Sequence, residues 1–156
     1  MRYLLGLIAL LGVLVFAASG SAMDMAGHGS HGTPPVWTAD DDADFLYGMI
    51  AHHKGAVDMS EALRGKGKDP QVAEWARAII AAQQLEIAQM EAIAKQTGAH
   101  DRGAGAQMTK DMAAMMANPA SPDPDVNFVA HMIPHHAGAV EMSLPALIGS
   151  DNPEIR

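Results

Sequence analysis

The chain has 156 residues, no cysteine and a formal net charge of −8. Without cysteine it can form neither disulfides nor thiolate metal sites, whatever the redox state of its compartment. The acidic balance argues against nucleic acid and anionic membranes as partners. Twelve Met and eight His stand beside only 3 Phe, 2 Trp and 2 Tyr. The placement of Met and His therefore has to decide between core packing and soft-metal binding.

The first 22 residues have the pattern of a secretory signal. Arg2 is followed by an apolar stretch over 3–18 and by the small residues of 19–22, which is typical of a segment that a signal peptidase removes. The stretch is short for a membrane span, and an uncleaved anchor is the alternative. We expect cleavage near Ala22 and a periplasmic or secreted protein.

The mature chain is expected to open with a disordered tail over 23–37, which is rich in Gly, His and Met. A helical metal-binding domain should occupy 38–156. Its first helix begins with the capping-box pattern of Thr38 to Asp41 and is predicted to end near Leu63, before "RGKGKD".

Three further helices are predicted after that break. The second starts at the Asp69-Pro70 cap and reaches Thr97, where Gly98 stops it. A short helix covers 107–117, and a longer one runs from Asp123-Pro124 to about Ile148. No segment alternates apolar and polar residues as a strand does, so the predicted fold is all-α.

One pattern occurs twice at a constant offset. "FLYGMIAHHKGAVDMS" spans 45–60 and "FVAHMIPHHAGAVEMS" spans 128–143, 83 residues later. At the same offset "DPQVA" (69–73) is matched by "NPEIR" (152–156). We interpret 38–98 as repeat one and 121–156 as an incomplete repeat two. A complete duplication would form a four-helix bundle; here the last helix is expected to be missing, and a homodimer is one way to cover the open face.

The repeated helices offer imidazole and thioether side chains at helical spacing. In each copy the first Met and the two His share one turn, and the last Met lies two turns further along the same face. The candidate ligands are Met49, His52, His53 and Met59 in copy one, and His131, Met132, His135, His136 and Met142 in copy two. This set favours Cu(I), Ag(I) or Cu(II) over Ca, Mg or Mn. The alternative is structural histidines, although four buried imidazoles would each need hydrogen-bond partners.

The second helix adds a carboxylate to this set. Its predicted buried stripe consists of Val72, Trp75, Ala76, Ile79, Met90 and Ile93. Glu86 falls within that stripe, together with Gln83. We expect Glu86 either to accept the N–H of a ligating His or to bind the metal directly, with Met90 as a further ligand. The alternative is that the helix is rotated, or that Glu86 reaches solvent from the edge.

Two other features have open interpretations. Met108, Met112, Met115 and Met116 form a stripe on the short helix, which is either a core cap or a metal-transfer platform. Pro134 lies beside His135, and it either kinks the last helix or starts its regular part.

The doubled pattern Phe-x-x-x-Met-Ile-x-His-His-x-Gly-Ala-Val-[Asp/Glu]-Met-Ser resembles a secreted bacterial family that is catalogued as a domain of unknown function and placed with ferritin-like four-helix bundles. The resemblance covers roughly 40–156 and includes "IIAAQQLEIAQM" of the second helix. It implies copper or silver binding through the repeated His and Met positions. The chain departs from the family in lacking the last helix.

The sequence therefore predicts a periplasmic or secreted protein that binds copper, or silver, for sequestration, resistance or transfer, without turnover. Its expected partners are metal ions, a copper-transfer protein and a second copy of the chain. A ferritin-like di-metal redox enzyme is the first alternative, but no Glu-x-x-His occurs. The second alternative is a metal-free helical interaction module, which copper would not stabilise thermally.

Overall fold

A computed structural model describes residues 37–156, which form four helices. Their bounds are α1 Ala39–Leu63, α2 Pro70–Thr97, α3 Ala104–Met116 and α4 Pro124–Gly149. No strand occurs in this range, and the all-α prediction is confirmed. The predicted signal over 1–22 and the tail up to residue 36 lie outside the described residues.

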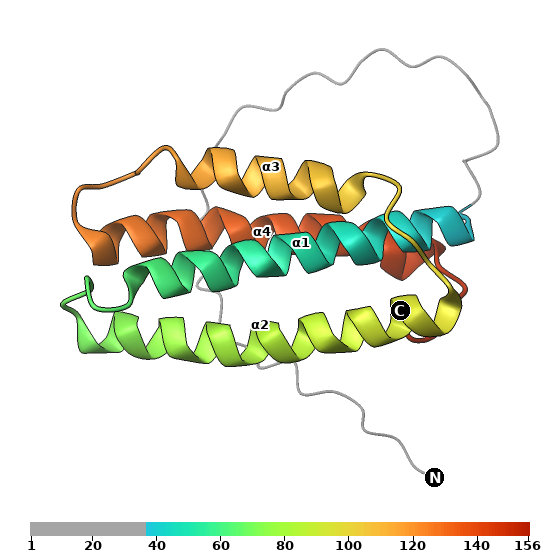
Figure 1. Ribbon diagram of the computed structural model, residues 1–156, viewed down its shortest axis with the longest axis horizontal. Helices are drawn as coiled ribbons and strands as arrows, with labels where there is room; N and C mark the ends of the chain where they lie inside the picture. Colours follow the sequence, from blue (N-terminus) through green and yellow to red (C-terminus); the bar gives the residue numbers. More distant parts are fainter. Residues whose placement is uncertain (1–36) are drawn as a thin grey trace, which may run out of the picture. The chain divides into compact units, whose positions relative to one another are not determined.

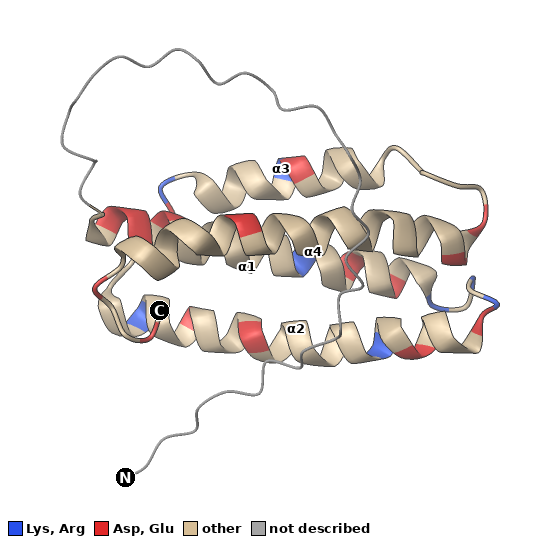
Figure 2. Ribbon diagram, turned by 180° about the vertical axis from the view of Figure 1, so that it is seen from behind, with Lys and Arg blue, Asp and Glu red and all other residues tan. Residues whose placement is uncertain are grey.

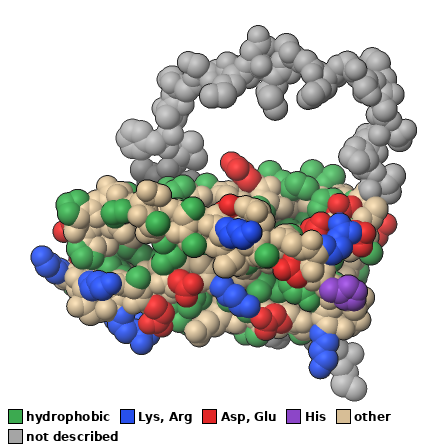
Figure 3. All heavy atoms as spheres, turned by 45° about the horizontal axis from the view of Figure 1, so that its top comes forward, with side chains coloured by type: hydrophobic (Ala, Val, Ile, Leu, Met, Phe, Trp, Pro, Cys, Tyr) green, Lys and Arg blue, Asp and Glu red, His purple; other side chains and the backbone are tan. Residues whose placement is uncertain are grey.

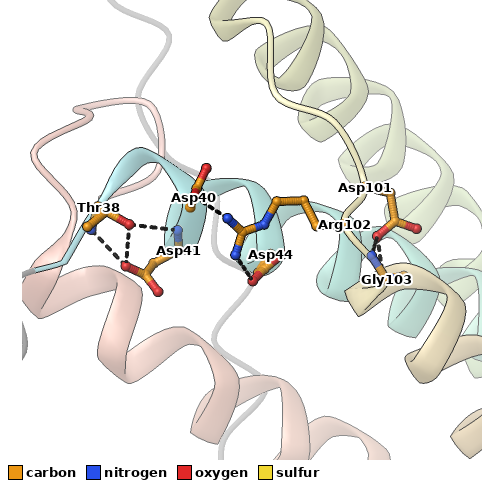
Figure 4. Close-up of polar contacts among 8 residues, drawn as sticks. Thr38, Asp40, Asp41, Asp44, Asp101, Arg102 and Gly103 are labelled. Carbon is orange, nitrogen blue, oxygen red and sulfur yellow. Dashed lines mark hydrogen bonds and ion pairs between the residues drawn. The ribbon is translucent and has the colours of Figure 1, made fainter.

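The helix starts follow from local capping. Thr38 and Asp41 form a reciprocal capping box at α1, with a bond of 2.8 Å from the Thr38 amide to the Asp41 carboxylate. The three acidic residues that follow Ala39 stabilise the start of α1, because their negative charges lie at the positive end of the helix dipole. Arg102 then pairs with Asp40 and Asp44, which ties the start of α3 to the start of α1 (Figure 4). Figure 2 shows the ribbon of acidic residues, in red, gathered at this end of α1.

The other two long helices share one type of start. Asp69 caps α2 and Asp123 caps α4; each side chain accepts the next two free amides, and each is followed by Pro. Gly98, with φ 72°, ends α2 in the left-handed conformation that favours glycine. Because these signals are local, the predicted bounds of α1, α2 and α4 agree with the structure.

The short helix α3 begins three residues earlier than predicted, at Ala104 instead of 107. The Asp101 carboxylate accepts the amides of Gly103 and Gly105, at 2.9 and 3.1 Å. This side chain starts the helix within a Gly/Ala-rich stretch whose composition indicated a loop.

Helix α1 lies at the centre of the arrangement and packs against each of the other three helices (Figure 1). Both α2 and α4 run antiparallel to α1, and α3 runs parallel to it. The α1 and α4 ends are tied together: the Asp125 carboxylate accepts the amides of Lys68 and Asp69 at 2.8 and 3.1 Å. The four helices do not form two equivalent pairs. Helices α1 and α4 carry the two copies of the repeated motif, and α3 lies in the segment that connects the two repeats.

The core forms where all four helices meet. Its buried members are Ala56, Met59, Leu63, Val72, Ala76, Phe128 and Met132, with Ile79, Met115 and Val129 packed against them. Within residues 37–156, no helix combines the length and the apolar composition that a membrane crossing requires.

Two expectations about helix faces are corrected. Trp75 was predicted in the buried stripe of α2 but is 44% exposed, while Gln83, which was also predicted there, is buried. Helix α2 is rotated so that Glu86 lies at the edge of the face that meets α1, with its side chain half-exposed. Pro134 does not start the regular part of α4, since the helix continues from Pro124 through Pro134 and Pro145.

The four Met residues of the α3 stripe differ in how far they are buried. Met108, Met112 and Met115 are half-buried, and Met116 is exposed. The face on which α3 comes forward carries apolar side chains between charged ones (Figure 3). The core-cap interpretation of this stripe therefore holds for Met115, which packs on the core cluster.

Candidate metal centre

Two equivalent residues of the repeats contact each other where α1 packs against α4. His52 of α1 and His135 of α4, 83 residues apart, stack with ring centroids 3.6 Å apart and planes inclined by 29°. Each is only 3% exposed. Because α1 and α4 are antiparallel copies, this pair marks a local two-fold axis that relates one helix to the other.

His135 is held in one tautomer. Its Nε2 lies 2.9 Å from the backbone carbonyl of His52. A carbonyl oxygen only accepts, so Nε2 carries the proton and Nδ1 has a free lone pair. The Nδ1 atoms of His135 and His52 are both buried without a hydrogen-bond partner, an arrangement that is uncommon for interior polar atoms.

His53 points instead toward α2. Its Nε2 lies 3.0 Å from the Glu86 carboxylate, which accepts the N–H. The buried Nδ1 of His53 has no hydrogen-bond partner. Of the two roles predicted for Glu86, the structure shows the hydrogen bond to a histidine.

His136, the counterpart of His53, lies on the exposed side of α4. Its Nδ1 donates to the Met132 carbonyl at 2.9 Å, which leaves Nε2 free. Among residues 37–156 no carboxylate pairs with His136 as Glu86 does with His53.

Burial keeps the central imidazoles neutral. Burial is the largest reason why the pKa values of His52 and His135 fall to about 4, and repulsion from the neighbouring imidazoles contributes to the same decrease. Burial also lowers the pKa of His53, against the opposing effect of the Glu86 carboxylate. At neutral pH these three rings are in the form that binds metal ions.

The candidate Met ligands come from α1, α2 and α4. Met49, Met59 and Met132 are buried, and Met90 and Met142 are half-buried. A Cβ at Gly48 would lie 3.5 Å from the Met142 methyl, so that Met of copy two lies against α1. His131, Met59 and Met116 line a cavity of about 260 Å³. It lies where the end of α1 meets the start of α4, since Leu63 and Pro124 also line it.

The imidazoles as placed do not form a closed metal cage. No three His, Asp or Glu side chains of the described residues lie close enough together to hold a metal ion. A metal bound to imidazole lies in the ring plane, and the planes of His52 and His135 are stacked. Metal binding by these two rings would therefore require that they turn, or that each combine with a Met sulfur.

Comparison with known protein families matches residues 42–156 to the family described as a domain of unknown function (DUF305). The chain belongs to the DUF305 family. The match includes both copies of the repeated motif, 45–60 and 128–143, and every candidate metal ligand named above.

One curated relative of this DUF305 chain is an uncharacterized protein of Acanthamoeba polyphaga mimivirus. It is 43% identical over 53 residues, which are 34% of this chain and 35% of the viral protein. The chain thus spans about a third of the length of that relative. No solved structure matches the chain.

Sequence reasoning about this DUF305 chain missed the direct contact between His52 and His135. The repeat itself contained a signal: when two copies of one helix pack antiparallel about a two-fold axis, one position must lie opposite itself. The helical wheel of a single copy gives no information on which position that is. Sequence reasoning also missed the cavity beside His131, because Met116 reaches it from a different helix.

Proposed function

We propose that this DUF305 protein binds copper, and also silver, through imidazole and thioether ligands of the repeated helices. The predicted secretory signal places this activity in the periplasm or outside the cell. There the protein would sequester the ion or pass it to a copper-transfer protein, and neither role needs a catalytic step.

The observation that carries the proposal is the hydrogen bonding of three histidines. His53, His135 and His136 each give one ring N–H to an oxygen acceptor and keep the other ring nitrogen free. Metal-binding histidines are commonly held in this way, because the acceptor fixes the tautomer and makes the free nitrogen more basic. The acceptors are the Glu86 carboxylate and the carbonyls of His52 and Met132.

The surrounding side chains support a soft ion. The candidate ligands are neutral imidazoles and Met sulfur atoms, and Glu86 is already engaged with His53. Such sites suit Cu(I) and Ag(I) better than Mg²⁺ or Ca²⁺, which need several oxygen ligands. No cluster of carboxylates among residues 37–156 supports the di-metal redox alternative.

An anaerobic competition titration tests the proposal. Cu(I) is added to the purified protein in the presence of a chromogenic Cu(I) chelator, and the affinity and stoichiometry are read from the chelator absorbance. We expect the His53→Ala/His135→Ala variant to bind at least about tenfold more weakly.

His100→Ala is the matched control, because His100 is exposed and lies outside both repeats. Far-UV circular dichroism checks that each variant keeps its helices. Unchanged affinity and stoichiometry in the folded double variant would remove the assignment.

A further inference from the structure

His131 is a buried histidine that copy one of the repeated motif lacks, since its counterpart there is Gly48. It is 8% exposed, and its ring makes no hydrogen bond within residues 37–156. Its nitrogens are not sealed from solvent as the Nδ1 atoms of His52 and His135 are. A neutral imidazole keeps one lone pair, so His131 offers a free and reachable nitrogen to a ligand in the cavity that it lines.

This cavity joins three helices. Met59 of α1, Met116 of α3 and His131 of α4 all line its volume of about 260 Å³. A single water needs roughly 10–15 Å³ of such volume, so a metal ion fits. Met59 is 7% exposed, whereas Met116 is 37% exposed. The cavity therefore reaches from the core, where Met59 lies, to the surface, where Met116 lies.

The local two-fold relation between α1 and α4 sets His131 against Met59. Gly48 is the counterpart of His131, and Met142 is the counterpart of Met59. A Cβ at Gly48 would lie 3.5 Å from the Met142 methyl. The equivalent contact at the other end is that of His131 with Met59, and both line the cavity. Copy two thus adds an imidazole where copy one has no side chain.

The lining of the cavity suits a soft monovalent ion. Among the described residues no Asp or Glu lines it, and Lys66 supplies its formal charge. Hard divalent ions need several oxygen ligands, and a positive side chain repels a divalent ion more strongly than a monovalent one. One imidazole and two thioethers are ligands for Cu(I) and Ag(I). The unbranched Met side chains can turn their sulfur atoms toward a common ion.

We propose that His131, Met59 and Met116 form a second soft-metal site, which takes up Cu(I) or Ag(I) directly from solvent. The kind of ion rests on the proposed function, but the site is separate, because neither His53 nor His135 lines the cavity. The free nitrogens of those two histidines are sealed, whereas the cavity is open. An ion that enters or leaves the protein is therefore exchanged at the second site.

A silver titration followed by NMR tests this site. The purified chain carries ¹³C at its Met methyl groups, and silver nitrate is added in chloride-free buffer. The methyl signals of Met59 and Met116 should shift together and saturate. These shifts should persist in His53→Ala/His135→Ala, which retains the cavity. In His131→Ala the Ag(I) affinity read from the same two signals should fall at least about tenfold, because the imidazole ligand is lost.

Met116→Leu is the second variant. Met116 is exposed, so its substitution leaves the core intact, and the Met59 signal should need several-fold more Ag(I) to shift. Met108→Leu is the matched control, because Met108 is on the same helix but does not line the cavity. It should leave the titration unchanged. Circular dichroism checks that each variant keeps its helices, and Met116→Leu decides if His131→Ala does not fold.

The outcomes separate this site from the proposed function. Unchanged affinity at Met59 and Met116 in His131→Ala and in Met116→Leu overturns the second site alone. Shifts that disappear in His53→Ala/His135→Ala overturn it too, since the cavity would not bind on its own. A titration in which no Met signal shifts contradicts both proposals. Binding at the second site, with Cu(I) affinity unchanged in His53→Ala/His135→Ala, removes only the assignment of those two histidines.

Discussion

His52 and His135 are kept neutral by their burial against each other, whereas His53 is buried beside α2 and His136 is exposed on α4. The four imidazoles come from one repeated motif, yet their partners differ. His52 and His135 stack on each other, and His135 also donates to the His52 carbonyl. His53 donates to the Glu86 carboxylate and His136 to the Met132 carbonyl of its own helix. Residue type and spacing are equal in the two copies. The difference in chemistry comes from which helix lies beside each copy.

The central pair makes the stability of the metal-free protein depend on pH. A histidine in the unfolded chain has a pKa of about 6.5, and burial lowers that of folded His52 and His135 to about 4. Below pH 6.5 the unfolded state therefore binds protons that the folded state does not. The free energy of unfolding should fall as the pH decreases from about 6.5 to about 4, by up to about 1.4 kcal/mol per pH unit for each residue.

Urea denaturation at a series of pH values, with a chelator present, measures this decrease. The His52→Gln/His135→Gln variant should show a flatter profile in the same window. An equally steep profile in that variant would mean that other groups cause the loss.

The Glu86 carboxylate orients His53, and Glu86→Gln tests this role. The pKa of His53 should fall further, because the carboxylate raises it in the folded protein. Cu(I) affinity should fall by about 10- to 100-fold, as is typical when the acceptor behind a metal-binding histidine is lost. Histidine NMR titration and the chelator competition give the two readings.

Glu91→Gln is the matched control, because Glu91 lies on the same helix but pairs with Lys54 at 3.3 Å. It should leave both the His53 pKa and the copper affinity unchanged. Equal losses in the two variants would indicate a general effect of charge.

At the scale of helices, α1 is the central element of the packing. It packs against α2, α3 and α4, and small residues let two of these approach closely. A Cβ at Gly55 would lie 2.7 Å from Met112 Cγ of α3, whereas a Cβ at Gly48 would be at an ordinary 3.5 Å from the Met142 methyl of α4. The α1–α3 contact is therefore the tighter of the two.

Gly55→Ala should destabilise the protein even though alanine favours a helix by roughly 0.5–1 kcal/mol over glycine. The new methyl group meets Met112 close to its backbone, so α3 must shift, and overpacking of this kind costs about 1–3 kcal/mol. Gly48→Ala is the control on the same helix and should be neutral or stabilising. Urea denaturation compares them, and Gly55→Ala/Met112→Ala should recover stability if the clash is the cause.

At the scale of the whole molecule, the candidate ligands come from helices that are distant in sequence. Copper bound between α1 and α4 would bind the folded state and not the separated helices. At a free copper concentration of 100 times Kd, such binding stabilises the folded state by about 2.7 kcal/mol.

Thermal unfolding with and without Cu(I) should therefore show a higher Tm for the loaded protein. The increase should disappear in His53→Ala/His135→Ala and persist in His100→Ala. A metal-free interaction module would show no copper-dependent change in any of the three.

The sequence by itself determined the four helices, the starts of α1, α2 and α4, and the repeated Met and His pattern. Thr38, Asp69 and Asp123 cap amides two or three residues away, and Gly98 ends α2 through its own backbone conformation. Interactions of this range are encoded in adjacent residues.

Only the tertiary structure decided which faces meet. It placed His52 against His135, turned Trp75 outward, brought Glu86 to His53 from the edge of α2 and left Ile133 uncovered. The rotation of each helix about its own axis depends on how all its neighbours fill the space around α1. A single helical wheel contains no information about those neighbours.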